Sequence, residues 1–182
     1  MAVTHYIEQS LTDGEELVMM GQFHWMYNVQ AVFNIVFSIA LSVAIIVFAV
    51  KYQPIFGGLP DYYSDLGWMG KVQMLHPGVR ILAFFVIVLG LLKFAQMMIV
   101  RATTEIGITN RRLVYKRGLV ARYVGEMNID RIEGVNVLQG ILGRIFNYGR
   151  IMVRGMGVGE VILPPIAEPI KFRRAIDYAR TV

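Results

Sequence analysis

Five basic residues gather around one predicted hairpin in the second half of the chain, where they could bind an anion. They are Arg111, Arg112, Lys116, Arg117 and Arg122. Guanidinium and ammonium groups bind phosphate oxygens, and each basic residue near an anionic bilayer surface contributes about 1 kcal/mol. The pattern predicts either contact with anionic lipid headgroups or a solvated basic hairpin, and both readings stay open at this point.

An apolar turn further along the chain is a second candidate surface. The run GILGRIFNYG at 140–149 holds Leu142, Ile145, Phe146 and Tyr148 between glycines. An apolar turn of this kind predicts either a contact surface for another protein subunit or a plug over the open end of a small domain.

Catalytic chemistry finds little support in the residue types. The chain has no cysteine, which excludes disulfides, thiolate metal sites and cysteine nucleophiles. His5, His24 and His76 are scattered, and none has a second histidine three or four residues away. The glycines of RGMGVGEV lack the Lys-Ser/Thr of a phosphate loop, so a strand connection is the better interpretation. We therefore expect no enzyme activity, no cofactor, no metal and no nucleic-acid partner.

Two long apolar segments are the strongest structural signal in the sequence. Hydrophobic residues make up 55% of the 182 residues, and the segment 29–50 carries no charge. A run of about 20 apolar residues spans the ~30 Å hydrocarbon core of a bilayer as a helix. The segment 81–100 is of similar length but contains one charged residue, Lys93. This lysine predicts either a side chain that extends to the interface or a contact with a carboxylate of another subunit.

The charge distribution predicts how such a hairpin is oriented. The first 28 residues contain no lysine or arginine, the loop 51–80 contains three, and the net charge of +5 comes from the segment after residue 100. Short loops poor in lysine and arginine are translocated, so both termini are predicted to be cytoplasmic and the loop external. A basic C-terminal half is also suited to an acidic partner or lipid, although topology alone accounts for it.

After residue 100 the pattern changes to short alternating runs that are typical of antiparallel strands. Phe172, Ile176 and Ala179 then recur at helical spacing after Pro169, which predicts a C-terminal amphipathic helix. The segment 15–20 predicts a short strand or helix packed on this domain, with its acidic residues facing basic ones. The expected strands are 104–109, 113–116, 119–127, 134–139, 150–154 and 160–163, with a helical turn at 140–147.

Several motifs together resemble the bacterial pleckstrin-homology (PH) domain, in the group of small membrane-flanked proteins. They are GITNRRLVYKRG, EMNIDRIEGVNVLQGILGRIFNYGRIMV and the PIAEP stretch before the last helix, with SLTDGEELVMMGQFHW as the opening. The resemblance implies an α+β protein: a transmembrane hairpin and a bent antiparallel β-barrel closed by a helix. The implied order is a segment 1–28, helices 29–50 and 81–100 joined by the loop 51–80, and a PH-like domain 101–182.

These observations favour a membrane-anchored scaffold or accessory subunit in the bacterial inner membrane. Its PH-like domain would serve protein–protein assembly, in a homo-oligomer or a larger membrane complex. The alternative is a module that binds anionic lipid headgroups. A third reading is a subunit of a transport or enzyme complex that uses Lys93.

Overall fold

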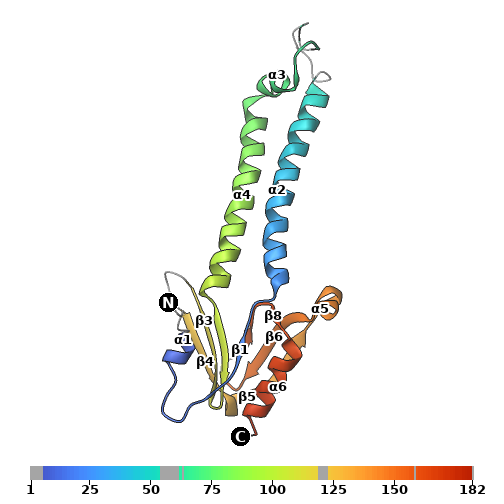
Figure 1. Ribbon diagram of the computed structural model, residues 1–182. Coiled ribbons are helices and arrows are strands. Elements are labelled where there is room, and N and C mark those ends of the chain that lie inside the picture. The colour runs from blue at the N-terminus through green and yellow to red at the C-terminus, as the bar shows by residue number, and fades with distance from the viewer. Residues whose placement is uncertain (1–5, 54–61, 63, 119–122, 158, 182) are drawn as a thin grey trace. The chain divides into compact units, whose positions relative to one another are not determined.

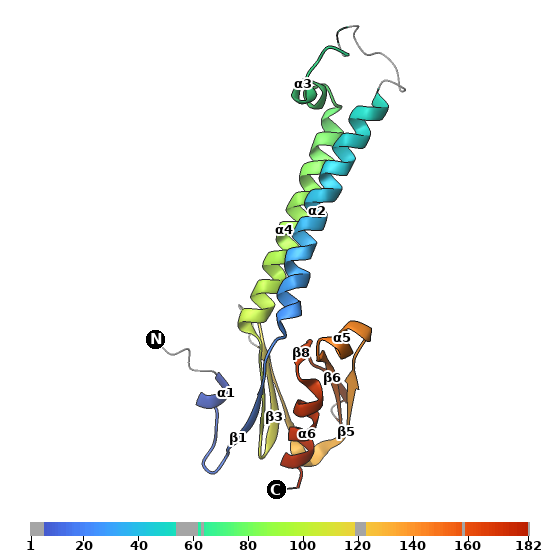
Figure 2. The same ribbon diagram turned by 45° about the vertical axis from the view of Figure 1, so that its right-hand side comes forward.

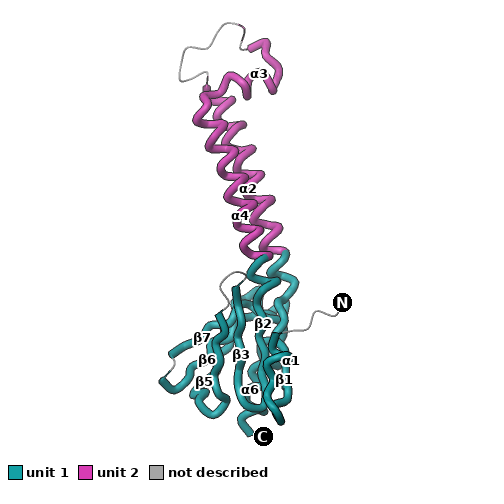
Figure 3. The backbone as a smooth tube through the Cα atoms, turned by 90° about the vertical axis from the view of Figure 1, so that its left-hand side faces the viewer, with its two compact units in different colours: residues 1–28, 99–182 teal, residues 29–98 magenta. Residues whose placement is uncertain are grey.

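The computed structural model describes residues 6–53, 62, 64–118, 123–157 and 159–181. The chain divides into two compact units, Met1–Asn28 with Ile99–Val182, and Val29–Met98 (Figure 3). The first unit holds the strands and is called the domain below. The second consists mainly of two long helices and is called the hairpin. The N-terminal segment thus belongs to the same unit as the C-terminal region, and not to a separate one.

Four antiparallel strands form the first sheet of the domain, in the order β1-β2-β3-β4 (Figure 1). The strand β1 comes from the N-terminal segment and pairs with β2, so that Met20 lies opposite Gly107. This pairing confirms that the segment before the first long helix packs on the domain. A short helix, α1 (Tyr6–Gln9), precedes it. The strands are β1 (Leu17–Gly21), β2 (Glu105–Thr109), β3 (Arg112–Arg117) and β4 (Tyr123–Asn128).

The second sheet has the order β5-β6-β7, with a short strand β8 that also pairs with β6. A 3-10 turn, Ile129–Arg131, leads from β4 into it, and the helix α5 (Ile141–Ile145) connects β5 to β6. The β-hairpin formed by β6 and β7 contains the glycines of RGMGVGEV, which confirms the predicted connection between two strands. The strands are β5 (Ile132–Leu138), β6 (Tyr148–Gly155), β7 (Gly159–Ile162) and β8 (Ile166–Ala167).

The expected closed barrel is not what the described residues form. β4 ends the first sheet and β7 ends the second. After β4 the chain passes through the turn Ile129–Arg131, where the Ile129 N–H still donates to the Arg111 carbonyl at 2.9 Å, next to the β3–β4 pair of Arg112 and Asn128. β5 then pairs with β6 instead of continuing beside β4. Within the described residues the domain is therefore two antiparallel sheets that are joined on one side, where Phe23, just after β1, forms an isolated bridge with Ile166 of β8.

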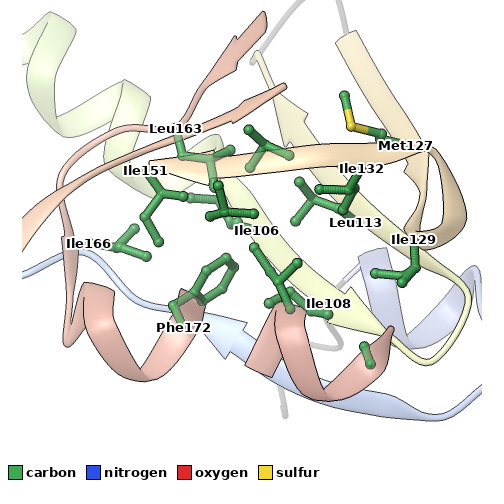
Figure 4. Packing of buried hydrophobic residues seen from close by; sticks show 14 residues of the cluster. Ile106, Ile108, Leu113, Met127, Ile129, Ile132, Ile151, Leu163, Ile166 and Phe172 are labelled. Carbon is green, nitrogen blue, oxygen red and sulfur yellow. The ribbon is translucent and has the colours of Figure 1, made fainter. Parts of the chain in front are cut away.

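The helix α6 (Pro169–Ala179) packs against both sheets, touching β1, β2, β5 and β6 (Figure 2). Phe172, Ile176 and Ala179 are all buried, which confirms the predicted apolar face. Phe172 lies in the middle of the core with Ile106 and Ile108 (Figure 4). At Gly21 an added Cβ would come within 3.0 Å of the Phe172 ring, so β1 packs directly on α6 because this strand position has no side chain.

The second unit contains most of α2 (Trp25–Tyr52) and α4 (Pro77–Thr103), with the short helix α3 (Trp68–Gln73) between them. Their contact is lined by small residues. Gly90 faces Ser38, and an added Cβ would lie 2.5 Å from the Ser38 Cβ. The Ser42 hydroxyl donates to the Ala83 carbonyl at 2.9 Å. Small residues let two helix backbones approach closely, so this seam holds the hairpin together.

The outer faces of both helices remain apolar and exposed. Only 17% of the most apolar window of either helix is buried, whereas the core helix of a soluble protein is mostly buried. Phe33, Phe48 and Phe84 are each more than 60% exposed. Both helices are long and apolar enough to cross a bilayer.

Candidate functional site

Arg112, one of the five predicted lipid contacts, is engaged inside the domain. Its Nε donates to Glu15 Oε1 and its Nη2 to Glu15 Oε2, both at 2.9 Å, which makes a bidentate pair. Nη1 donates to Glu126 at 2.7 Å and Nη2 to the Ser10 carbonyl at 2.8 Å. Glu15 and Ser10 precede β1 while Arg112 begins β3, so this arginine ties the N-terminal segment to the first sheet.

The environment of the Glu15 carboxylate lowers its pKa strongly. Burial alone would raise its pKa, but the hydrogen bonds from Arg112, the Thr12 backbone and the two threonine side chains outweigh burial. Those threonines are Thr12 and Thr109, whose hydroxyls donate at 2.9 and 2.8 Å. Together they lower the pKa to about 2. The same pair raises the pKa of Arg112. We call Glu15 together with its partners Arg112, Thr12 and Thr109 the Glu15 latch.

Lys116 is also paired within the domain. Its Nζ lies 2.7 Å from Glu105 on the neighbouring strand and 4.9 Å from the centre of the Tyr6 ring. Its side chain is largely covered. Two of the five predicted headgroup ligands therefore serve the packing of α1 and the sheet.

The remaining basic residues do not form one cluster. Arg111 and Arg117 are exposed at opposite ends of β3, roughly 20 Å apart at about 3.4 Å per residue. The Arg117 guanidinium lies 5.1 Å from the Tyr123 ring centre. Arg122 lies outside the described residues. Of the four described members of the predicted basic hairpin, Arg111 and Arg117 are exposed and separate, and lipid contact by the five residues stays a prediction.

The apolar turn lies on the surface. Ile141 is 81% exposed and Ile145 is 68% exposed, and Leu142 and Phe146 are exposed beside them. We call these four residues the α5 patch. This exposure argues against a plug, because the sheets do not close into a barrel that needs one. Tyr148 is half-buried and lies apart from the patch, stacked on His24 with ring centres 5.1 Å apart.

The backbone around α5 is held firmly. The Gln139 amide donates to the carbonyls of Gly143 and Tyr148, at 3.2 and 3.0 Å. An added Cβ at Gly143 would lie 2.6 Å from the Tyr148 carbonyl oxygen. Asn147 turns the chain with a φ of 57°, a conformation that Asn tolerates well. The α5 patch is therefore a preformed surface.

Aromatic residues before α2 meet this end of the domain. Trp25, the first residue of α2, is 54% exposed and contacts Phe146 edge-on at 5.7 Å between ring centres. His24 Nδ1 accepts from the Met26 N–H at 3.2 Å, which orients the imidazole against Tyr148. The α5 patch thus continues onto the residue that opens the first long helix.

A groove lies where the two sheets end. It is a cavity of about 260 Å³ bordered by β3, β4 and β7. Tyr115, Tyr123 and Val161 supply apolar surface, and the Tyr123 ring lies against Gly125, where an added Cβ would be 3.3 Å from it. β4 is an end strand of the first sheet, and five of its residues, Tyr123 to Met127, line this groove.

Lys93 is exposed on α4, one turn after Gly90. Its predicted role as an intramembrane or subunit contact stays a prediction. Within the described part of the chain, no group of three or more His, Asp or Glu residues is placed to hold a metal ion.

Comparison with known sequence families shows to which family the chain belongs. The family model of the bacterial PH domain matches residues 21–180. The chain belongs to the bacterial PH domain family. No significant match was found among curated proteins or among solved structures.

The residues that carried the resemblance have structural roles in this bacterial PH domain. In GITN, Thr109 donates to Glu15, and the Asn110 side chain accepts from the Glu16 N–H at 3.1 Å. In the Tyr-Gly pair, an added Cβ at Gly149 would lie 2.6 Å from Gln139 Cγ. These residues of the motifs thus maintain the fold.

Trp25 and the groove were missed by sequence reasoning as parts of a site. The position of Trp25 before the uncharged run 29–50 predicts an aromatic anchor at the headgroup level, whereas its contact with Phe146 needs the tertiary structure. The groove depends on which strands end each sheet, which local sequence does not encode.

Proposed function

We propose that this bacterial PH domain protein is a non-catalytic, membrane-anchored docking module. Its domain would take up an extended segment of a partner protein in the groove between β4 and β7. The partner is another membrane protein or a further copy of the chain, as in an accessory subunit of a membrane complex. The observation that carries the proposal is the open end strand β4 beside an apolar groove.

The anchoring part of the proposal rests on α2 and α4. Their outward faces are apolar over a length that matches a bilayer, and few of these residues are buried within the chain. In water this exposed surface would favour aggregation, whereas lipid chains would cover it at no such cost.

The pairing of β1 with β2 supports a common side for both ends of the hairpin. One strand precedes α2 and the other follows α4, so a paired sheet requires them in the same compartment. The excess of lysine and arginine after α4 favours the cytoplasmic face of the bacterial inner membrane.

The docking part rests on how proteins bind extended segments. An end strand offers unpaired backbone N–H and C=O groups, and an added strand satisfies them while its side chains enter adjacent pockets. Tyr115, Tyr123 and Val161 provide such a pocket beside β4. Aromatic residues are enriched among those that dominate binding energy.

Binding of anionic headgroups is the second candidate function, favoured by the exposure of Arg111 and Arg117. The pairing of Arg112 and Lys116 with acidic residues weakens it, since their charges are already neutralised. A transport or enzyme complex that uses Lys93 would be one setting for the docking module.

Site-specific photo-crosslinking tests the docking proposal. A photoreactive phenylalanine analogue replaces Tyr123 at the groove, and in a matched variant it replaces Tyr178 on α6, where the tyrosine is similarly exposed. In native membranes we expect a discrete crosslinked product from position 123 and none from position 178. Equal products from both positions, or none from 123, would refute docking at the groove.

A further inference from the structure

The α5 patch and Trp25 form one apolar surface, and we infer that it lies in the headgroup region of the bilayer as a second membrane contact of the domain. The inference rests on the proposed membrane span of α2. It adds a lipid-embedded site to a protein whose anchoring would otherwise be confined to the two long helices.

The first argument is the position of Trp25. This residue opens α2, and the uncharged run 29–50 follows within one helical turn. Tryptophan is enriched at the level of the headgroups, where its ring is half in an apolar environment and its N–H is in a polar one. A residue in contact with Trp25 therefore lies near that level as well.

The second argument is the direct contact between Trp25 and the α5 patch. Phe146 packs edge-on against Trp25 at 5.7 Å, within the domain unit. The Phe23 bridge to Ile166 and the Gln22 carbonyl, which accepts from the Ala167 N–H at 2.8 Å, fix the chain before α2 to β8. These contacts hold the α5 patch beside the start of the helix.

The third argument is the composition of the turn. Ile141, Leu142 and Ile145 project apolar side chains from a fixed backbone, and Arg144 and Arg150 are exposed beside them. Burial of apolar side chains with flanking arginines at anionic headgroups is the pattern of an interfacial helix. A protein partner would be expected to bring acidic groups to the two arginines, whereas anionic lipid supplies them without a further chain.

Lipid-dependent quenching of a single label tests this inference. The chain has no cysteine, so Ile145→Cys or Ile141→Cys provides one labelling site for an environment-sensitive fluorophore. Tyr178→Cys on α6 is the control. The full chain is reconstituted in vesicles of phosphatidylethanolamine and phosphatidylglycerol that carry a spin-labelled lipid with a shallow quencher.

We expect quenching at positions 145 and 141 that is at least about twofold stronger than at position 178, with blue-shifted emission, because only a label in the interface meets the quencher. Emission in the range of water with quenching by iodide would overturn the inference. Blue-shifted emission without lipid quenching would also overturn it, and would assign the patch to a protein contact. A chain that does not enter the vesicles would refute the membrane span itself, which is a separate outcome.

Discussion

Replacing Glu15 with glutamine is expected to lower the free energy of unfolding of the domain by about 3 kcal/mol, because it leaves the buried part of Arg112 without its bidentate partner. Arg112 keeps only Glu126 and the Ser10 carbonyl as partners. Hydrogen exchange of the β2 and β3 amides in the full chain measures the change. Glu16→Gln is the matched control, since the neighbouring Glu16 side chain is exposed and should change the exchange little.

The Glu15 latch also predicts the acid sensitivity of the domain. The pKa of Glu15 falls from an ordinary 4.5 to about 2 in the folded state. A lowered pKa gives stability that is complete above pH 4.5 and is lost as the pH falls through the folded pKa. The loss amounts to about 3 kcal/mol at about 1.4 kcal/mol per pKa unit. In Glu15→Gln this part of the pH dependence should vanish, and an unchanged acid profile would show that the latch does not govern it.

Replacing Gly90 with leucine is expected to separate α2 and α4. The new side chain would occupy the position of Ser38, so the two helices must move apart at this point. Overpacking of this kind lowers the free energy of unfolding by about 1–3 kcal/mol, and the close approach of the two helices depends on small residues at this position.

A disulfide between Ser42→Cys and Ala83→Cys reports the separation, because the chain has no cysteine of its own. Its yield under mild oxidation should fall with Gly90→Ala, whose Cβ alone would lie 2.5 Å from the Ser38 Cβ, and fall further with Gly90→Leu. Leu91→Phe adds volume on the exposed side of α4 and should leave the yield unchanged. Equal yields in all variants would exclude Gly90 as the point of closest approach.

The elements with a strong local pattern could be predicted from the sequence. The two long helices follow from apolar length, and α6 follows from Phe172, Ile176 and Ala179, all of which are buried. The predicted helical turn at 140–147 is present as α5. In each case the residues that define the element are close together in the chain, so composition and spacing suffice.

The site could be predicted less well, because it depends on pairing between distant residues. Arg112 resembles a surface cation until β1 is placed beside β2, which brings Glu15 to it across 97 positions. The apolar turn at 140–147 likewise could be a plug only if the strands closed into a barrel, and local sequence does not show whether they do. The sequence also does not indicate that the first sheet ends at β4. The three-residue turn Ile129–Arg131 separates β4 from β5, and β5 belongs to the second sheet.

The order of the strands has a consequence for synthesis of the protein. β1 is made first, but its partner β2 follows only after both long helices have left the ribosome. Until then Glu15 has neither Arg112 nor Thr109, and the first sheet cannot begin to assemble. If α2 and α4 cross the membrane as proposed, completion of the domain would report that the hairpin has returned the chain to its starting side, and a wrongly inserted copy would leave β1 without its partner β2.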